Sequence, residues 1–139
     1  MQVSAHVQNS HGQHNVTLTT NGNPHSIVIP SKPSGFGSSA NGGELLFLAL
    51  ATCYCNDIYR EAAKRGIQVE QVEVTVEGQF GAEGGPATDV TYRARVVAHA
   101  PEAEIRELMQ HTDTVAEIQN TLRVATAVTL ASIEAVAVR

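Results

Sequence analysis

"NGGELLFLALATCYCNDIYREAAKRG", from Asn41 to Gly66, is the stretch that decides the fold, because it carries the clearest helical signals in the chain. Asn41 can cap a helix, and Glu44 follows three residues later, which is the spacing of a capping box. Basic residues end the stretch and suit the C-terminal end of a helix dipole, and Gly66 is a natural residue just past a helix end. The sequence therefore predicts one long helix from about Gly42 to Arg65.

The first half of this helix, from Leu45 to Cys55, is apolar on nearly every side, whereas the second half, from Asn56 to Arg65, is amphipathic. A helix that is apolar all round has to be buried all round. A chain of 139 residues has difficulty covering such a helix completely. We therefore expect a second copy of the chain to supply the missing cover, in a homodimer.

The segments on either side of the helix predict an α+β chain. The first thirty residues alternate apolar and polar side chains and contain an Asn21-Gly22 hairpin signal, so we expect three antiparallel strands there. The Gly- and Ser-rich Pro30–Gly43 predicts a loop. The other expected elements are strands at Val69–Phe80 and Val90–Ala100, a helix with Pro101 at its first position, a short helix that Thr114 and Glu117 start as a capping box and that ends near Leu122, and a closing strand within Val124–Val136. We expect a single domain of residues 1–139 in the order βββ-α-ββ-αα-β.

The composition excludes several classes of protein. The chain is 42% hydrophobic with a net charge of −5 and no basic run, so nucleic acid is not an expected partner. No charged segment followed by an apolar one opens the sequence, so we expect no signal peptide. The longest apolar run, Leu45 to Ala51, is too short to cross a membrane. Two cysteines two positions apart do not predict a disulfide scaffold, and we expect a soluble cytoplasmic protein.

Both cysteines lie on the predicted helix, at Cys53 and Cys55. Positions two apart on a helix point about 200° away from each other, so we expect no disulfide between them. Each is either a reactive thiol or a small hydrophobic residue of the core, since most buried cysteines are inert. Glu44 is a candidate general base, although its place in the capping box already explains it.

The six histidines do not predict a metal site. No cysteine pair or carboxylate stands beside them at zinc-binding spacing, so we expect surface histidines and no metal. No motif in the sequence predicts a cofactor either.

The stretch "GFGSSANGGELLFLALATC" resembles the central-helix motif of the OsmC/Ohr family, the bacterial proteins of osmotic induction and organic hydroperoxide resistance. "KRGIQVEQVEVTVEG" and "QNTLRVATAVTL" are similar to later parts of the family pattern, so the resemblance covers nearly the whole chain. It implies an OsmC-like fold, in which an antiparallel sheet wraps long central helices in an intertwined homodimer. It also implies peroxiredoxin-like chemistry against oxidative stress, in which a low-pKa cysteine attacks an organic hydroperoxide and becomes a sulfenic acid.

The resemblance assigns the family's thiols only in part. Cys53 falls on the position of the peroxidatic cysteine, and Cys55 has no counterpart. The second, resolving cysteine opens a Cys-Pro-x-Ser-x-x-Leu segment in the family. Here that segment is "AEIQNTL", so Ala116 stands in place of the resolving cysteine and Glu117 in place of the proline.

The residues that activate the thiol in the family are also displaced. Its catalytic Glu lies ten residues before the cysteine, where this chain has Gly43, with Glu44 one residue later. Its catalytic Arg comes from the early strand turn, where this chain has Gln13 and His14. Three of the four parts of the usual site are therefore missing or displaced.

Two functions are compatible with this sequence. One is a thiol peroxidase-like enzyme that uses Cys53 and is resolved either by Cys55 or by an external thiol. The other is a non-enzymatic protein of the same fold that binds a small apolar ligand in the groove between subunits.

Overall fold

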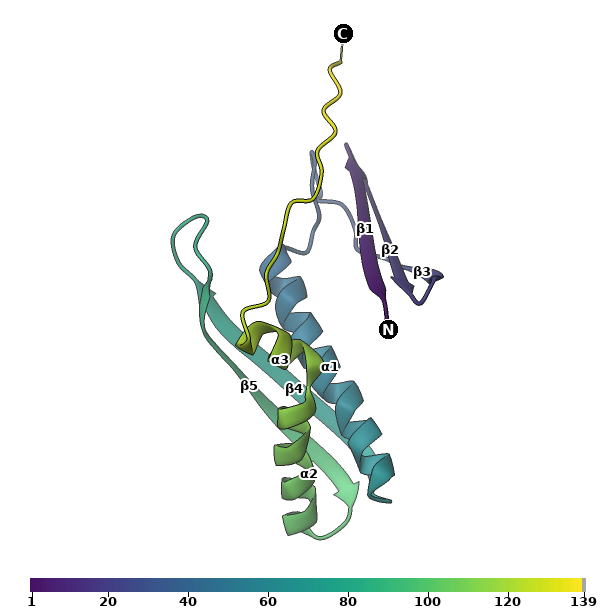
Figure 1. Ribbon diagram of the computed structural model, residues 1–139, viewed down its shortest axis with the longest axis vertical. Coiled ribbons are helices and arrows are strands. Elements are labelled where there is room, and N and C mark those ends of the chain that lie inside the picture. Colours follow the sequence, from purple (N-terminus) through teal and green to yellow (C-terminus); the bar gives the residue numbers. More distant parts are fainter. Residues whose placement is uncertain (139) are drawn as a thin grey trace. The chain divides into compact units, whose positions relative to one another are not determined.

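The structure, a computed structural model, describes residues 1–138 and groups them into two compact units, one up to Phe47 and the other from Leu48 onward. Figure 1 shows the elements in chain order. They are the strands β1 (Val3–Ser10), β2 (Gln13–Thr20) and β3 (Asn23–Ile27), the helix α1 (Gly42–Lys64), the strands β4 (Gln68–Phe80) and β5 (Ala87–His99), and the helices α2 (Glu102–Val115) and α3 (Glu117–Arg123).

The first unit contains the three antiparallel strands that the sequence predicts. β2 lies between β1 and β3 in an up-and-down sheet. Asn21 and Gly22 join β2 to β3 with φ angles of 49° and 80°, as a two-residue type I′ turn requires. The hairpin prediction at this pair is therefore confirmed.

Helix α1 begins and ends on the residues that the sequence indicates. The Asn41 side chain accepts a hydrogen bond from the Glu44 backbone N–H at 2.8 Å, and the Glu44 carboxylate accepts one from the Asn41 N–H at 3.0 Å. At the other end, Gly66 has a φ of 66°, and the N–H groups of Gly66 and Ile67 donate to the carbonyls of Ala63 and Ala62. These bonds form a capping box and a Schellman motif, which fix the helix bounds.

The second unit is built around a long β4–β5 hairpin, with α1 and α2 running along it (Figure 1). Tyr54, Ile58 and Ala62 of α1 and Leu108 of α2 form a buried cluster. The residues packed against this cluster are Ile67, Val69, Val72, Val74, Tyr92, Ala94, Val96 and Met109. A bulge between Val69 and Gln71 lets Val69 and Val72, three positions apart, both pack against this core.

The closing strand expected within Val124–Val136 is not formed. These residues have no regular secondary structure, and Figure 1 shows them leaving α3 as an extended segment. Their large apolar side chains are exposed, including Val128, Leu130 and Ile133. A strand needs a partner edge to complete its hydrogen bonds, and sequence alternation alone does not supply that edge.

Two expected helix starts also differ. Helix α2 begins at Glu102, so Pro101 is its N-cap rather than its first residue. The capping box of Thr114 and Glu117 is wrong, because α2 continues to Val115 and Ala116 becomes the N-cap of α3. The Thr114 hydroxyl donates instead to the His111 carbonyl at 2.6 Å, and the Glu117 carboxylate is bound elsewhere.

Helix α1 is not covered on all sides within one chain. Leu48 is 59% exposed, and the exposed stripe continues along the helix through Thr52, Asn56, Tyr59 and Ala63. Among residues 1–138, no helix is both long enough and apolar enough to cross a membrane.

Candidate functional site

Cys53 lies where the middle of α1 meets the start of α3. Its thiol donates toward the Asp57 carboxylate, one helical turn further along α1, with Sγ at 3.5 Å from Oδ2. It also donates toward the Glu117 carboxylate of α3, at 3.7 Å from Oε2. The sulfur therefore faces two acids, one from its own helix and one from a helix 64 residues further along the chain.

These surroundings favour the neutral thiol. Burial raises the pKa of Cys53, the backbone N–H of Ile118 lowers it, and the Asp57 and Glu117 carboxylates raise it again, with a net upward shift. Burial and a hydrogen bond with Glu117 raise the pKa of Asp57. The Glu117 pKa is lowered by its own backbone N–H, by Asp57 and by Arg60. Asp57 is therefore the better proton acceptor of the two acids.

Arg60 forms ion pairs with the acids around Cys53. Its guanidinium contacts the Asp57 carboxylate at 3.1 Å and the Glu117 carboxylate at 2.7 Å, both through Nη1, and the Glu61 carboxylate at 2.9 Å through Nε. Asp57 and Glu61 are nearly fully buried, and a buried carboxylate needs a paired charge. Arg60 thus holds Asp57 and Glu117 together beside the thiol.

Glu61 extends the same network away from Cys53. Besides Arg60, its carboxylate accepts hydrogen bonds from Lys64 at 2.9 Å and contacts the His111 ring nitrogen Nε2 at 3.0 Å. The hydrogen bonds from Lys64 and Arg60 lower the pKa of Glu61 to about 2. Glu61 is therefore an ionised structural group that ties α1 to α2.

Hydrogen bonds from α3 to α1 and to α2 hold the chain around Glu117 in place. Gln119 is buried, and its side-chain amide donates to the Leu50 carbonyl of α1 at 3.0 Å. Arg123 donates to the Asp113 carboxylate at 2.7 Å, and Tyr92 donates to the same carboxylate. These bonds fix the corner between α2 and α3 that presents Glu117 to Cys53.

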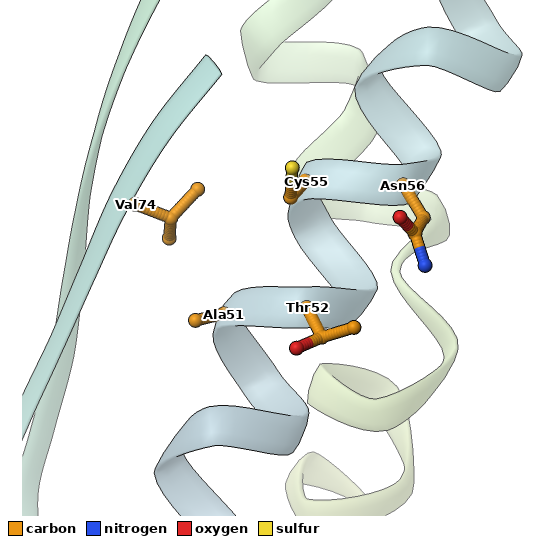
Figure 2. Close-up of a pocket in the computed structure, with 5 residues that line it drawn as sticks. All are labelled: Ala51, Thr52, Cys55, Asn56 and Val74. Carbon is orange, nitrogen blue, oxygen red and sulfur yellow. The ribbon is translucent and has the colours of Figure 1, made fainter. Parts of the chain in front are cut away.

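Cys55 lies on a different side of α1 from Cys53, and both cysteines are free in the structure. Figure 2 shows Cys55 and Ala51 on the side of the helix that faces Val74 of β4. Together with Thr52 and Asn56 they line a pocket of about 230 Å³. Cys55 therefore does not share the acidic surroundings of Cys53.

The other residues singled out from the sequence have surroundings of their own. Glu44 is engaged in the capping box, and any catalytic role for it stays a prediction. His14 contacts the Asn9 side chain at 3.0 Å within the β1–β2 hairpin. Ala116, which the family resemblance places at the position of the resolving cysteine, is fully buried.

Cys53, Asp57 and Glu117 also bring three potential metal-ligating atoms within 4.8 Å of one another. None of the six histidines belongs to this set. Both carboxylates of this set are paired with Arg60.

Sequence reasoning missed Asp57 and Arg60. Asp57 is four residues after Cys53 and Arg60 three residues after Asp57, spacings that place side chains on one helix face. That periodicity could have found them. Glu117 was noticed only as a capping-box residue and as a departure from the family motif, because nothing local indicates that α3 returns to α1.

Comparison with known proteins gives a consistent result. The family model described as OsmC-like protein matches residues 35–131. Among solved structures, an OsmC-like protein of unknown function from Vibrio cholerae has a TM-score of 0.62 at 18% identity, covering 87% of this chain and 93% of that one. An OsmC-like protein from Mycoplasma pneumoniae has a TM-score of 0.59 at 16% identity, covering 88% and 89%.

A third similar structure is an organic hydroperoxide resistance protein from Elizabethkingia anophelis, with a TM-score of 0.53 at 16% identity, covering 90% of this chain and 93% of that one. No curated protein matches the sequence. At these identities the solved structures establish a shared fold.

Proposed function

Since this chain belongs to the OsmC-like protein family, we propose that it reduces organic hydroperoxides through Cys53. The observation that carries the proposal is the thiol of Cys53 donating toward two carboxylates, one of which, Asp57, can take up its proton. The similarity to an organic hydroperoxide resistance protein supports the choice of substrate class.

The proposed reaction balances with the groups present. The sulfur of Cys53 attacks the distal oxygen of the hydroperoxide, the O–O bond breaks, and the sulfur is oxidised to a sulfenic acid while the hydroperoxide is reduced to an alcohol. The thiol proton passes to Asp57, which returns it to the departing alkoxide. Arg60 holds the Asp57 carboxylate in place during this transfer.

Reduction of the sulfenic acid needs a thiol from outside the chain. Ala116 occupies the resolving position, and Cys55 opens onto a pocket on another side of α1. An external thiol forms a mixed disulfide with Cys53 and releases water, and a second thiol then restores Cys53 as a disulfide of the reductant leaves. We place this chemistry in the cytoplasm, where such thiols are kept reduced.

The test is to trap the sulfenic acid. The protein is treated with tert-butyl hydroperoxide and then with dimedone, and the labelled residue is identified by mass spectrometry. We expect label on Cys53, loss of label in Cys53→Ser, and full label in Cys55→Ser. Absence of label on Cys53 under conditions that alkylate free thiols would refute the peroxidase.

A failed test would favour the non-enzymatic alternative, in which the protein binds a small apolar ligand. The mostly apolar pocket beside Cys55 is the observation for that alternative. Its volume of about 230 Å³ is smaller than the roughly 300–1,000 Å³ of usual ligand sites.

We also propose that the chain forms a homodimer, and two exposed features support this proposal. The stripe from Leu48 to Ala63 leaves apolar side chains of α1 uncovered. The segment of residues 125–138 carries exposed apolar side chains and forms no strand in the part of the chain that the structure describes. A second copy can cover the stripe and provide a sheet edge for the segment. Light scattering at micromolar concentration should give twice the chain mass of 14.8 kDa, and a folded monomer would contradict the proposal.

A further inference from the structure

Two carboxylates of different helices face the sulfur of Cys53, and their charge acts on every oxidation state of that sulfur. The Asp57 and Glu117 oxygens lie 3.5 Å and 3.7 Å from Sγ. An oxygen atom added to the sulfur during oxidation stays next to both acids. Anions formed at this position are disfavoured because they are created beside existing negative charge.

We infer that Asp57 and Glu117 hold oxidised Cys53 at the sulfenic acid and slow its further oxidation to the sulfinic acid. The inference rests on the proposed function, which supplies the sulfenic acid. In the further step, the sulfur of the sulfenic acid attacks a second hydroperoxide, whose O–O bond breaks. The sulfur takes up the distal oxygen with its hydrogen and becomes a sulfinic acid, and the S–O–H proton passes to the departing alkoxide, which leaves as an alcohol.

The reactive form in this second step is the sulfenate anion, as the thiolate is in the first. Both carboxylates oppose ionisation of the S–O–H group, and both offer acceptor oxygens that stabilise its neutral form. Arg60 is bound to the same carboxylates at 3.1 Å and 2.7 Å, so it also keeps them in position beside the sulfur.

The chain supplies no partner that consumes the sulfenic acid. Ala116 is buried at the resolving position, and Cys55 lines a pocket on another side of α1. A protected sulfenic acid without an internal thiol is long-lived. Such a site suits a protein whose oxidised state persists until an external thiol meets it, as in a hydroperoxide-responsive switch.

The experiment compares Glu117→Gln with Glu77→Gln. Both residues are exposed carboxylates in ion pairs with an arginine, Glu117 with Arg60 at 2.7 Å and Glu77 with Arg93 at 3.2 Å. The variants therefore remove the same charge, but only the first removes it from beside Cys53. The time courses of sulfenic and sulfinic acid under excess tert-butyl hydroperoxide are followed by mass spectrometry, and the two rate constants are fitted separately.

We expect the rate constant for sulfinic acid formation to rise about fivefold in Glu117→Gln, as for loss of a charge at this distance in water-like surroundings. Glu77→Gln should match the parent. Asp57→Asn should act in the same direction as Glu117→Gln, and thermal melting identifies a variant that has lost its fold.

The outcomes separate the inference from the proposed function. If the parent forms no sulfenic acid, the peroxidase itself is refuted. If the parent forms sulfenic acid but Glu117→Gln yields sulfinic acid no faster, the inference is overturned while the peroxidase stands. An equal rise in Glu77→Gln would also overturn it, because the effect would then come from net charge.

Discussion

Replacing Asp57 with Asn should make Cys53 react faster with an alkylating reagent. The Asp57 carboxylate lies 3.5 Å from the sulfur, and it raises the pKa of the thiol both through its charge and by accepting the S–H hydrogen bond. Asn keeps the size of the side chain and removes the charge. More of the thiol is then ionised at neutral pH, and the thiolate is the form that is alkylated.

The size of the effect follows from the distance. A unit charge at this range is worth about 1 kcal/mol in water and about 5 kcal/mol at an effective dielectric constant of about 20. Arg60, at 3.1 Å from the Asp57 carboxylate, cancels part of this charge, so the lower figure is appropriate. Carbamidomethylation of Cys53 at pH 7 should therefore accelerate about fivefold.

The assay is time-resolved alkylation with iodoacetamide, with the Cys53 and Cys55 labels quantified by mass spectrometry. Cys55 serves as an internal control because it lies on another side of α1. Asp89→Asn is the matched variant, since Asp89 is an exposed acid of β5 whose φ of 54° Asn tolerates. Slower Cys53 alkylation in Asp57→Asn would show that this acid activates the thiol, and an unchanged rate would show that it has no influence on the thiol. Either result would refute the reasoning.

The same variant should respond differently to a hydroperoxide. If Asp57 returns the thiol proton to the departing alkoxide, Asp57→Asn loses that step while gaining thiolate. The rate of Cys53 oxidation by tert-butyl hydroperoxide should then rise less than the alkylation rate. Equal increases in both rates would remove Asp57 from the proton transfer and leave it as a charge that suppresses the thiolate.

Two further predictions concern stability. Asn41→Ala should lower the free energy of unfolding by about 1 kcal/mol, measured by urea denaturation, because it removes one half of the capping box that starts α1; an unchanged midpoint would contradict this role. Glu61, whose pKa falls from 4.5 to about 2 on folding, stabilises the protein above pH 4.5, and this contribution is lost as the pH drops toward 2. Urea midpoints of the parent should therefore fall more steeply between pH 5 and pH 2 than those of Glu61→Gln, and parallel curves would show that Glu61 does not couple folding to protons.

The parts of the fold predicted correctly are those that neighbouring residues decide. Asn41 with Glu44, Asn21 with Gly22, and Gly66 each fix a backbone geometry through bonds within a few residues. The closing strand depends on a distant edge, so an alternating pattern could not establish it. The Thr114 and Glu117 pair matched a capping-box motif, but the capping box does not form, because the Glu117 carboxylate binds Arg60 instead.

The candidate site likewise contains residues that the sequence places and one residue that only the structure places. Cys53 was identified through the family resemblance, and Asp57 and Arg60 follow from helical spacing once Cys53 is chosen. Glu117 could not be placed from spacing, because 64 residues separate it from Cys53 and only the packing of α3 against α1 joins them. The long-range member of the site is thus the one that needed the structure.

Glu117 changes the chemistry expected of this position as well as its geometry. The family resemblance places a resolving cysteine and a proline at Ala116 and Glu117, whereas in this structure the corner between α2 and α3 presents a carboxylate to Cys53. Arg60, the cation beside this site, is paired with three carboxylates, so its positive charge is shared among them. Both features act in one direction, since each favours neutral sulfur over its anion. A site built this way slows the further oxidation of the sulfenic acid, but it also slows the first attack of Cys53 on the hydroperoxide. Slow oxidation with a persistent sulfenic acid fits this site better than rapid turnover.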